Sequence, residues 1–478
     1  MKKNKRKNYR VEFLNKFKPI VDKHKDELPF FKMDKEYRNQ EYETHSWFNI
    51  SREKSKKTKP IVTATDKLDK CKCKAIKIKM ILSDTHKQIL QNWFNAYTMI
   101  YNKTLDYIRE NFQFTKKEVN RDILSNEINN NQNFYNKFYI RNQMLEEKKK
   151  IQKNFSLIID KTKTKNKLED IKCEIDIHTL NKSIFQLVEN IKACKTNMMR
   201  GNIKRFRLKY WKYNRPSKTM ELEKGKITDG ILCKSVFNDL EDIKYYYNNK
   251  EYKLDDITHD FKINYNSILD EYSLYIPISI SKTKIENKRK IIILDPGLRT
   301  FMTGLSDYEK FNICPDVNKI IKKDIKRLNK VKNNNLISNK IKKKTEKIIN
   351  RKIINKINDM HWKVVNFLTN NYDTIFLGDM SAKGIVAKSN KVLSKEMKTA
   401  CLRTRYYEFR LRLKYKCSVT NTKFKLINEC YTSKTCSQCG NYDNNLGGNK
   451  IYNCLNCKLK IDRDVNGCRN IYMKQFIK

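Results

Sequence analysis

Two Cys-x-x-Cys pairs near the carboxyl end carry the clearest chemistry in this sequence. They are Cys436 with Cys439, and Cys454 with Cys457. Four thiolates from two tight turns are the ligand set of a tetrahedral, structural Zn²⁺ site. The 14 residues between the pairs fall just short of the loop of about 15–20 residues that is usual in a zinc ribbon. Because loop length is a soft constraint, the spacing predicts one structural zinc ion rather than four unrelated reduced cysteines.

Carboxylates at the ends of expected strands form the second chemical feature. Asp295 ends an apolar run, Asp379 and Glu429 end two further strand-like segments, and Asp464 follows the second cysteine pair. Three carboxylates on one side of a sheet can hold two Mg²⁺ ions about 4 Å apart, a pair that activates water for phosphodiester hydrolysis. Hard oxygen ligands favour Mg²⁺ over Zn²⁺. Each acid alone could equally be a turn or helix cap, but together with the zinc knuckle and the basic chain they favour a nuclease.

Length and charge bound the kind of protein. The chain has 478 residues, with 103 Lys and Arg against 53 Asp and Glu, a net charge of +50. A hydrophobic fraction of 39% indicates a folded chain of several domains. The expected partner is a polyanion, bound in a salt-dependent way. Compositional bias could replace Arg by Lys, but it does not explain a twofold excess of bases over acids.

Cysteine usage and hydropathy indicate the compartment. The 14 cysteines come without a secretory signal, which favours a reducing, intracellular location. No apolar run approaches the roughly 18 residues of a membrane span, so we expect no membrane association.

The expected elements follow from residue periodicity. Residues 71–82 alternate as a strand, and a helix follows whose apolar stripe is more typical of a core than of a base-stacking platform. Residues 1–70 read as a partly disordered basic extension, with a short helix from Val11 to Lys18 that Pro19 stops. Further segments are strands at 290–295, 374–381 and 422–430, a helical pair at 317–372, and one helix from about Glu396 to Lys416.

Residues 204–212 interleave basic and aromatic side chains. Phe206 and Leu208 alternate with Arg205, Arg207 and Lys209, the pattern of a strand with one buried and one basic face. Such a surface suits a nucleic-acid backbone with base stacking, although a solvated edge strand fits this stretch equally well. The candidate nucleic-acid-binding residues are Lys204, Arg205, Arg207, Lys209, Trp211 and Lys212.

Several motifs resemble one family. LDPGLRTFMTG, YTSKTCSQCG with NCLNC, and DRDVNGCRNI resemble the RuvC-like segments and embedded zinc ribbon of TnpB and Fanzor proteins. These are transposon-encoded, RNA-guided DNA endonucleases related to type V CRISPR effectors. IKIKMILSDTHKQILQNWFNAYTMIYNKTL is similar to their amino-terminal signature, so the resemblance covers residues 71–478.

The resemblance implies specific catalytic residues. Asp295 matches the first catalytic Asp and Asp464 the last, with Asp462 as the alternative. TnpB proteins carry Glu-Asp-Leu after the second strand, whereas this chain has Gly378-Asp379-Met380. Fanzor proteins instead supply that acid just before the YTSKTC segment, where this chain has Glu429. The implied catalytic residues and Mg²⁺ ligands are therefore Asp295, Glu429 and Asp464, with Asp379 replacing Glu429 if the correspondence fails.

The implied architecture is an α/β and α multidomain protein. An RNase H-like RuvC nuclease domain holds an inserted four-Cys zinc ribbon, and a small β-barrel (wedge) domain with a helical recognition insert precedes it. The expected division is an N-terminal extension at 1–70, wedge at 71–83, recognition domain at 84–200, wedge at 201–289, nuclease at 290–435, zinc ribbon at 436–457 and nuclease at 458–478.

The implied function is that of an RNA-guided, Mg²⁺-dependent DNA endonuclease. Its partners would be a transposon-derived guide RNA and target double-stranded DNA, joined in an RNA–DNA heteroduplex that the protein grips by shape and charge. We expect a monomeric ribonucleoprotein in the nucleus of a eukaryotic cell or in the host cell of a DNA virus. The alternatives are a DNA transposase or recombinase that joins strands, and a catalytically inactive nucleic-acid-binding protein. The Gly at position 378 supports the inactive protein, and Glu429 argues against it.

Overall fold

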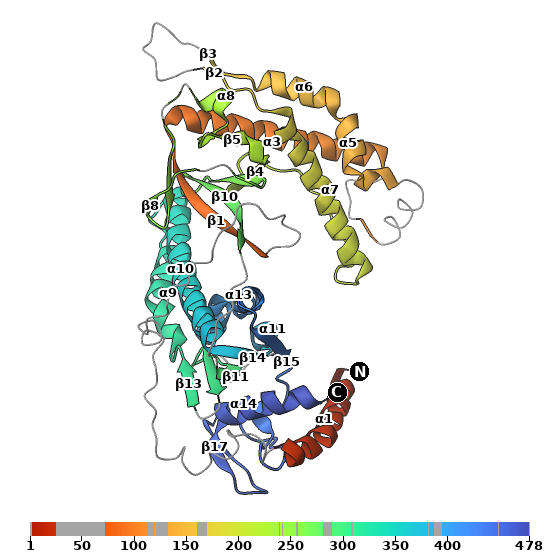
Figure 1. Ribbon diagram of the computed structural model, residues 1–478, viewed down its shortest axis with the longest axis vertical. Helices are drawn as coiled ribbons and strands as arrows, with labels where there is room; N and C mark the ends of the chain where they lie inside the picture. The colour runs from red at the N-terminus through yellow and green to blue at the C-terminus, as the bar shows by residue number, and fades with distance from the viewer. Residues whose placement is uncertain are drawn as a thin grey trace. The chain divides into compact units, whose positions relative to one another are not determined.

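The chain folds into two compact units, one formed by residues 62–280 and one that combines residues 1–61 with 281–478 (Figure 1). The computed structural model describes residues 2–24, 72–112, 119–120, 132–159, 170–238, 240, 242–254, 257–280, 289–306, 309–380, 382–386, 394–447 and 449–477. The prediction of an α/β multidomain protein is confirmed at this level. In the described part of the chain, no helix is long and apolar enough to cross a membrane.

The unit at 62–280 contains a six-stranded antiparallel sheet with the order β4-β9-β10-β1-β7-β8. Apolar and basic residues alternate along β1, so that one face of the strand is buried and the other is solvent-exposed. Ile76, Ile78 and Met80 are buried, while Lys77 and Lys79 are exposed. Closure of this sheet into a barrel stays a prediction. The strands are β1 (Lys72–Ile81), β4 (Ser217–Leu222), β7 (Lys244–Tyr247), β8 (Lys250–Glu251), β9 (Phe261–Asn266) and β10 (Glu271–Ile280).

Helices dominate the rest of this unit. The apolar stripe expected on the first long helix is buried, which confirms it as core. The elements are α3 (Asp84–Asn111), η2 (Gln132–Tyr135), α5 (Lys137–Gln143), α6 (Leu145–Asn154), β2 (Leu157–Ile159), β3 (Asp170–Lys172), α7 (Ile177–Met199), η3 (Lys224–Lys226), β5 (Ile227–Thr228), β6 (Ile231–Leu232) and α8 (Lys234–Phe237).

The strand expected around residues 205–211 is wrong. Phe206 makes one isolated antiparallel bridge with Val119, and no ladder continues from it among the described residues on either side. Side chains of α3 satisfy the following backbone instead: Arg109 donates to the carbonyl oxygen of Leu208, and Asn102 accepts from the amide of Trp211. The alternation of buried and exposed side chains is correct, but it arises from an extended segment laid along a helix.

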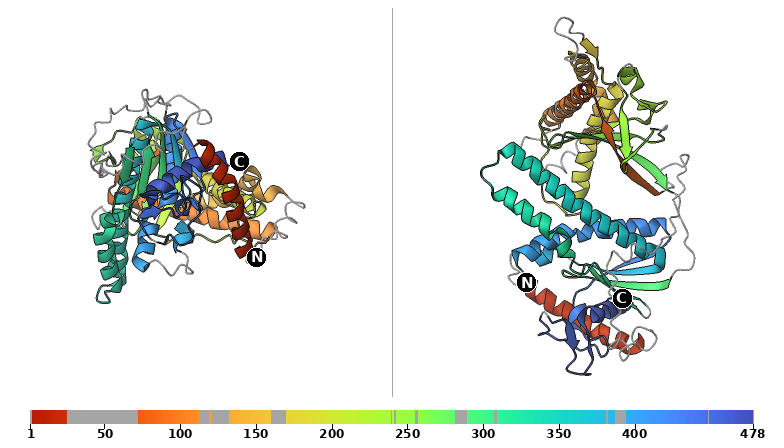
Figure 2. Two further views of the ribbon diagram at one scale, coloured as in Figure 1. Left: turned by 90° about the horizontal axis from the view of Figure 1, so that it is seen from below. Right: turned by 90° about the vertical axis from the view of Figure 1, so that its left-hand side faces the viewer.

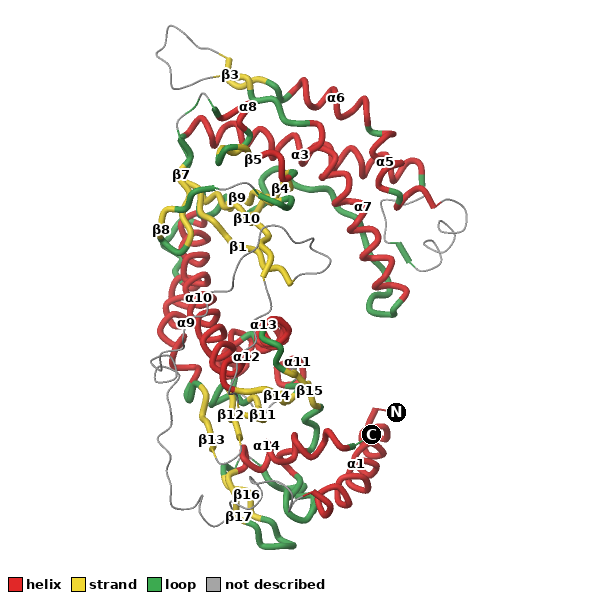
Figure 3. Tube along the Cα trace, in the orientation of Figure 1, coloured by secondary structure: helices red, strands yellow, loops and turns green. Residues whose placement is uncertain are grey.

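The second unit is built on a five-stranded sheet with the order β13-β12-β11-β14-β15 (Figure 3). β11, β12 and β13 pair antiparallel, whereas β11, β14 and β15 run parallel. The carboxyl ends of these three parallel strands therefore meet at one edge of the sheet. The strands are β11 (Arg289–Pro296), β12 (Met302–Ser306), β13 (Glu309–Ile313), β14 (Tyr372–Gly378) and β15 (Lys423–Ile427).

Opposite faces of this sheet bury against different helices (Figure 2). Ile292 and Leu294 of β11 belong to a core cluster with α10 and α13, whereas Ile293 between them packs in a second cluster with α14 and α1. Alternation along a strand that is buried on both faces explains this division. The helices are α1 (Lys2–His24), α9 (Val317–Asn333), α10 (Asn339–Asn371), α11 (Ala382–Val386), α12 (Lys395–Thr404), α13 (Tyr406–Val419) and α14 (Arg463–Met473).

Two expected helix boundaries are wrong. The single helix near 396–416 is divided into α12 and α13, because Arg405 between them adopts a left-handed conformation with φ 53°. At the amino end, Pro19 does not stop the helix, and α1 continues through it to His24. An internal proline costs about 3 kcal/mol, and burial of Phe17 and Val21 on either side of it offsets that cost. The rest of the expected extension, residues 25–70, lies outside the described residues.

Candidate active site and metal centre

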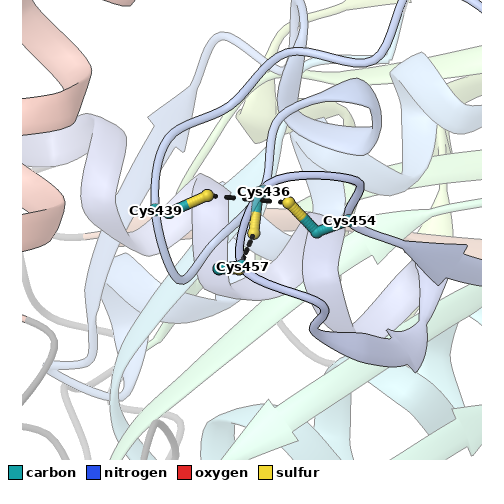
Figure 4. A group of neighbouring side chains, drawn as sticks. All are labelled: Cys436, Cys439, Cys454 and Cys457. Carbon is teal, nitrogen blue, oxygen red and sulfur yellow. Dashed lines mark hydrogen bonds between the residues drawn. The ribbon is translucent and has the colours of Figure 1, made fainter.

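The four cysteines of the two Cys-x-x-Cys pairs converge (Figure 4). Their sulfur atoms all lie within 4.8 Å of one another, and this is the only such group of potential metal ligands among the described residues. Cys436 and Cys457 have sulfurs 3.5 Å apart, and Cys439 and Cys454 have sulfurs 3.6 Å apart. A tetrahedron with Zn–S bonds of 2.3 Å has edges of about 3.8 Å. The cluster could therefore hold a metal ion such as Zn²⁺.

Short elements bring the cysteine pairs together. The first pair follows η4 (Thr432–Lys434), and the second lies between β16 (Ile451–Asn453) and β17 (Lys460–Asp462), which pair antiparallel. Gly440 closes the first turn with φ +71°, a left-handed conformation that glycine adopts without strain. Local turn geometry thus accounts for most of this site.

Asp295 lies at the carboxyl edge of the central sheet, one residue before the end of β11. The pKa of its carboxyl is raised well above the usual range, first by burial and then by repulsion from Glu429 and Asp464. Repulsion of this kind requires that the three carboxylates be neighbours. A cation placed among them would remove it. The structure therefore brings Asp295, Glu429 and Asp464 to the same region, although more widely spaced than the cysteines.

Glu429 reaches this edge from beyond β15, and Gly378 leaves room for it. A Cβ atom on Gly378 would lie 2.8 Å from Oε2 of Glu429, so the carboxylate occupies the space that a side chain at position 378 would need. That oxygen is buried and has no hydrogen-bond partner within the described part of the chain. Burial, followed by repulsion from Asp379, raises the pKa of Glu429 to about 7. A buried, unsatisfied carboxylate oxygen is the donor that a hard cation would satisfy.

Asp464 comes from the first turn of α14, which packs across β11 and β12. The close approach of α14 to Asp295 depends on Gly467, because a Cβ atom on Gly467 would lie only 2.6 Å from Oδ2 of Asp295. Burial and repulsion from Asp462 raise the pKa of Asp464, while Lys310 and Arg463 oppose that shift. Sequence reasoning missed Gly467. The sequence feature that could have revealed Gly467 is its position one helical turn after Asp464, within the DRDVNGCRNI motif.

The two alternative acids have other partners. Asp462 caps α14 by accepting hydrogen bonds from the amides of Asp464 and Val465, and its carboxylate forms a 2.8 Å ion pair with Lys310. Asp379 is exposed and forms an ion pair with Arg410. Both carboxylates are thus engaged in contacts within the fold.

A pocket of about 320 Å³ opens at the ends of β11 and β14, on the side of α13. Its lining residues include Pro296, Gly378, Asp379, Tyr406 and Arg410. Asp379 is the one carboxylate in this lining, so the pocket does not join Asp295, Glu429 and Asp464.

The zinc-type knuckle braces α14 through two buried asparagines. Asn466 accepts from the amide of Ser437 and donates to the carbonyl of Thr435. Asn470, one turn later, donates to the carbonyls of Thr432 and Thr435. The segment that carries the first cysteine is thus hydrogen-bonded to the helix that carries Asp464.

The basic segment at residues 204–212 lies in the unit formed by residues 62–280. Lys204, Arg205, Arg207, Lys209 and Lys212 are all exposed there. Trp211 is half-buried and stacks on Tyr101, with ring centroids 3.7 Å apart, while the Arg215 guanidinium lies 3.9 Å from its ring centroid. Exposed cationic side chains thus follow this segment, whereas the Trp211 ring is engaged within its own unit.

The chain is similar in sequence to several known proteins. Residues 406–471 match the family model described as Cas12f1-like, TNB domain. The chain is 29% identical over 436 residues to TnpB-like protein L770 of Acanthamoeba polyphaga mimivirus, a match that covers 88% of this chain and 75% of the relative. It is 30% identical over 127 residues to the CRISPR-associated endodeoxyribonuclease Cas12f1 of Sulfoacidibacillus thermotolerans, covering 25% of this chain and 30% of that protein.

A solved structure also resembles the chain. The cryo-EM structure of a Cas12f1–sgRNA–target DNA complex has 13% sequence identity and a TM-score of 0.45, and it covers 82% of this chain and 83% of that chain. The assignment rests on the sequence matches. A two-unit α/β protein with a four-cysteine knuckle beside an acidic sheet edge is the class that the fold and site define. The sequence matches support a TnpB/Fanzor-type family for this chain.

Proposed function

We propose that this protein is an RNA-guided, Mg²⁺-dependent DNA endonuclease whose catalytic residues are Asp295, Glu429 and Asp464. The observation that carries the proposal is the carboxylate of Glu429 in the gap above Gly378, close enough to Asp295 to raise its pKa. Glu429, which follows β15, thus occupies the space that an acidic side chain at position 378, the end of β14, would take. The similarity to TnpB-like proteins and to a Cas12f1 endodeoxyribonuclease supports a nuclease.

The three carboxylates would hold two Mg²⁺ ions. Such a pair supplies an activated water and stabilises the leaving oxygen of a phosphodiester. An all-oxygen donor set with one buried, unpartnered oxygen fits this ion better than Zn²⁺. We propose that the sheet bearing these acids is the RNase H-like nuclease core.

The rest of the site orients these acids. Arg410 holds Asp379 in an ion pair and so leaves Glu429 as the acid that enters the gap. Lys310 holds Asp462 in the same way, which leaves Asp464 free to face Asp295. The cysteine knuckle, with one structural Zn²⁺ bound, would fix α14 through Asn466 and Asn470.

The nucleic-acid partners follow from charge and family. A net charge of +50 suits an RNA–DNA heteroduplex, which proteins of this kind grip through its backbone. The exposed lysines and arginines at 204–212 are candidates for part of that contact. We propose a guide RNA transcribed near the transposon end and a double-stranded DNA target chosen by base pairing.

The deciding experiment begins with purification of the full chain from cells that carry its native flanking DNA. We expect one structured RNA from the adjacent flank to copurify, and we expect the complex to cut matched duplex DNA with Mg²⁺. Glu429→Gln should abolish cutting while RNA binding persists. Joined DNA strands among the products would favour a transposase or recombinase. Random cellular RNA without cutting would leave a nucleic-acid-binding protein.

A further inference from the structure

Glu429 lies outside the strand ladder that would normally fix a catalytic acid. Gly378 is still paired, opposite Ile427 of β15, and the last backbone contact of this ladder joins the amide of Asp379 to the carbonyl of Ile427. Glu429 follows two residues later, where no strand neighbour holds it. An acid moved from a strand to a loop needs another support to keep its geometry.

Lys474, in η5 (Lys474–Phe476) after α14, supplies contacts on both sides of Glu429. Its ammonium group donates to the carbonyl oxygen of Cys430 at 2.8 Å and to the side-chain oxygen of Asn428 at 3.5 Å. Lys474 is only 8% exposed. Among the described residues Lys474 forms no ion pair with a carboxylate, and burying a lysine in that state is costly, which indicates a specific role for its two contacts.

The amino-terminal helix closes over this lysine. The ring centroid of Phe13 lies 4.6 Å from Nζ of Lys474, a cation–π contact, and Phe13 also stacks on Tyr431 at 5.8 Å. α1 lies beside α14, and Phe13, Phe17 and Val21 join the core cluster that contains Ile471 (Figures 1 and 2). Phe13 therefore shields Lys474 and fixes the residue that follows Cys430.

Local hydrogen bonds complete the support. The carbonyl oxygen of Glu429 accepts from the amide of Thr432 at 3.2 Å and from its hydroxyl at 2.8 Å. The side chain of Asn428 accepts from the amide of Cys430 at 2.9 Å. The backbone on either side of Glu429 is held in this way, and Oε2 of Glu429 lies in the gap above Gly378, 2.8 Å from the position of a Cβ atom there.

We propose that Lys474, seated against Phe13 of α1, is a positioning residue that fixes the backbone around Glu429 and aims its carboxylate at the metal site. This inference rests on the proposed function. It also makes α1 a working part of the nuclease unit, although its sequence suggested only a basic extension.

The test measures Mn²⁺ binding to the zinc-loaded full chain by electron paramagnetic resonance, after bound nucleic acid is removed at high salt. Lys474→Met should weaken Mn²⁺ binding about 10–100-fold, the usual effect of losing support around a ligand. Lys474→Arg, which keeps the charge, should restore most of it, and Phe13→Ala should weaken it as well. Lys425→Met is the matched control, because Lys425 is an exposed lysine on β15 that contacts Gln475.

A double-mutant cycle separates positioning from general destabilisation. In a Glu429→Gln background, Lys474→Met should cause no further loss of Mn²⁺ affinity, and zinc content should stay at one ion per chain. Equal losses in both backgrounds, or a Lys474→Met variant that binds Mn²⁺ as the wild type does, would overturn the positioning role. Absence of Mn²⁺ binding by the wild type would instead overturn the proposed metal site, and the positioning role with it.

Discussion

The absence of a side chain at position 378 determines where an acid can stand at the sheet edge. A methyl group there would meet Oε2 of Glu429 at 2.8 Å, Pro296 at 3.0 Å and Ile471 at 3.2 Å. The carboxylate is the flexible member of this set, so it would move first. A glycine at this point is thus a condition for Glu429 to approach Asp295.

Gly378→Ala is therefore expected to lower the cleavage rate on the order of 10²-fold, because a shift of about 1 Å in a reacting group has that effect. The melting temperature should fall modestly, since Pro296 and Ile471 must also shift to admit the methyl group, and the rates are compared at a temperature at which both proteins stay folded. Gly225→Ala is the matched control, because a Cβ atom there meets nothing within 4 Å. A Gly378→Ala enzyme with the wild-type rate would refute this account of the gap.

His361 predicts a pH dependence of stability. It is fully buried, its Nε2 lies 3.0 Å from the carbonyl oxygen of Thr404, and its Nδ1 lies 3.0 Å from Arg412. Nε2–H can donate to the carbonyl while Nδ1 accepts from Arg412, which requires the neutral ring. Burial, followed by repulsion from Arg412, lowers the pKa of His361 to about 3.

The pKa of His361 is lower in the folded protein than in the unfolded chain. As the pH falls, the unfolded chain therefore binds a proton on His361 first, and this favours unfolding. The contribution of His361 is fully present above about pH 6.5, and it declines by about 1.4 kcal/mol per pH unit below that value. His361→Gln should remove this part of the pH dependence. The measurement is the unfolding free energy of both proteins at about pH 7.5 and at about pH 5.5, on either side of the usual His pKa. Parallel stability curves would contradict the prediction.

Among the elements, the cysteine knuckle and α14 form one mechanical unit. The knuckle segment offers the amide of Ser437 and the carbonyls of Thr432 and Thr435 to two asparagines of α14, and α14 carries Asp464 against Asp295. Loss of the metal would release the segment, and the helix would lose its buried partners.

If the knuckle binds zinc as proposed, Cys436→Ser should abolish zinc binding and destabilise the unit that contains the five-stranded sheet by several kcal/mol, roughly, since structural zinc contributes folding free energy directly. Zinc content by atomic absorption and the melting temperature check this prediction. Cys194→Ser, in the other compact unit, is the control and should keep both. Full zinc occupancy with normal melting in Cys436→Ser would show that the knuckle does not brace the helix.

For the whole molecule, the charge of +50 predicts RNA binding that weakens steeply with salt. If Arg207 and Lys209 contact phosphates, replacing each by Ala should reduce the slope of log K against log salt concentration by about 1. Lys150→Ala is the control, because Lys150 already pairs with Glu147. Affinities measured by filter binding across a salt series give the slopes, and equal slopes for all variants would exclude this segment from the interface.

Short-range patterns determine what the sequence alone could predict. The cysteine pairs lie on tight turns, and the strands at β11, β14 and β15 follow from apolar runs, so both features depend on neighbours within a few residues. The family motifs likewise lie on continuous segments. These parts of the fold were predicted from the sequence, and the structure confirms the strands and the convergence of the cysteines.

Only the tertiary structure decided which acids become neighbours and what supports them. The register of β14 with β15 sets Gly378 opposite Ile427, and the resulting gap admits a carboxylate from 51 positions later in the chain. The packing of α1 on α14 likewise overrides the proline that seemed to end the helix, because burial of Phe17 and Val21 outweighs one lost hydrogen bond. Such contacts join distant residues through shape and burial, which no local pattern encodes.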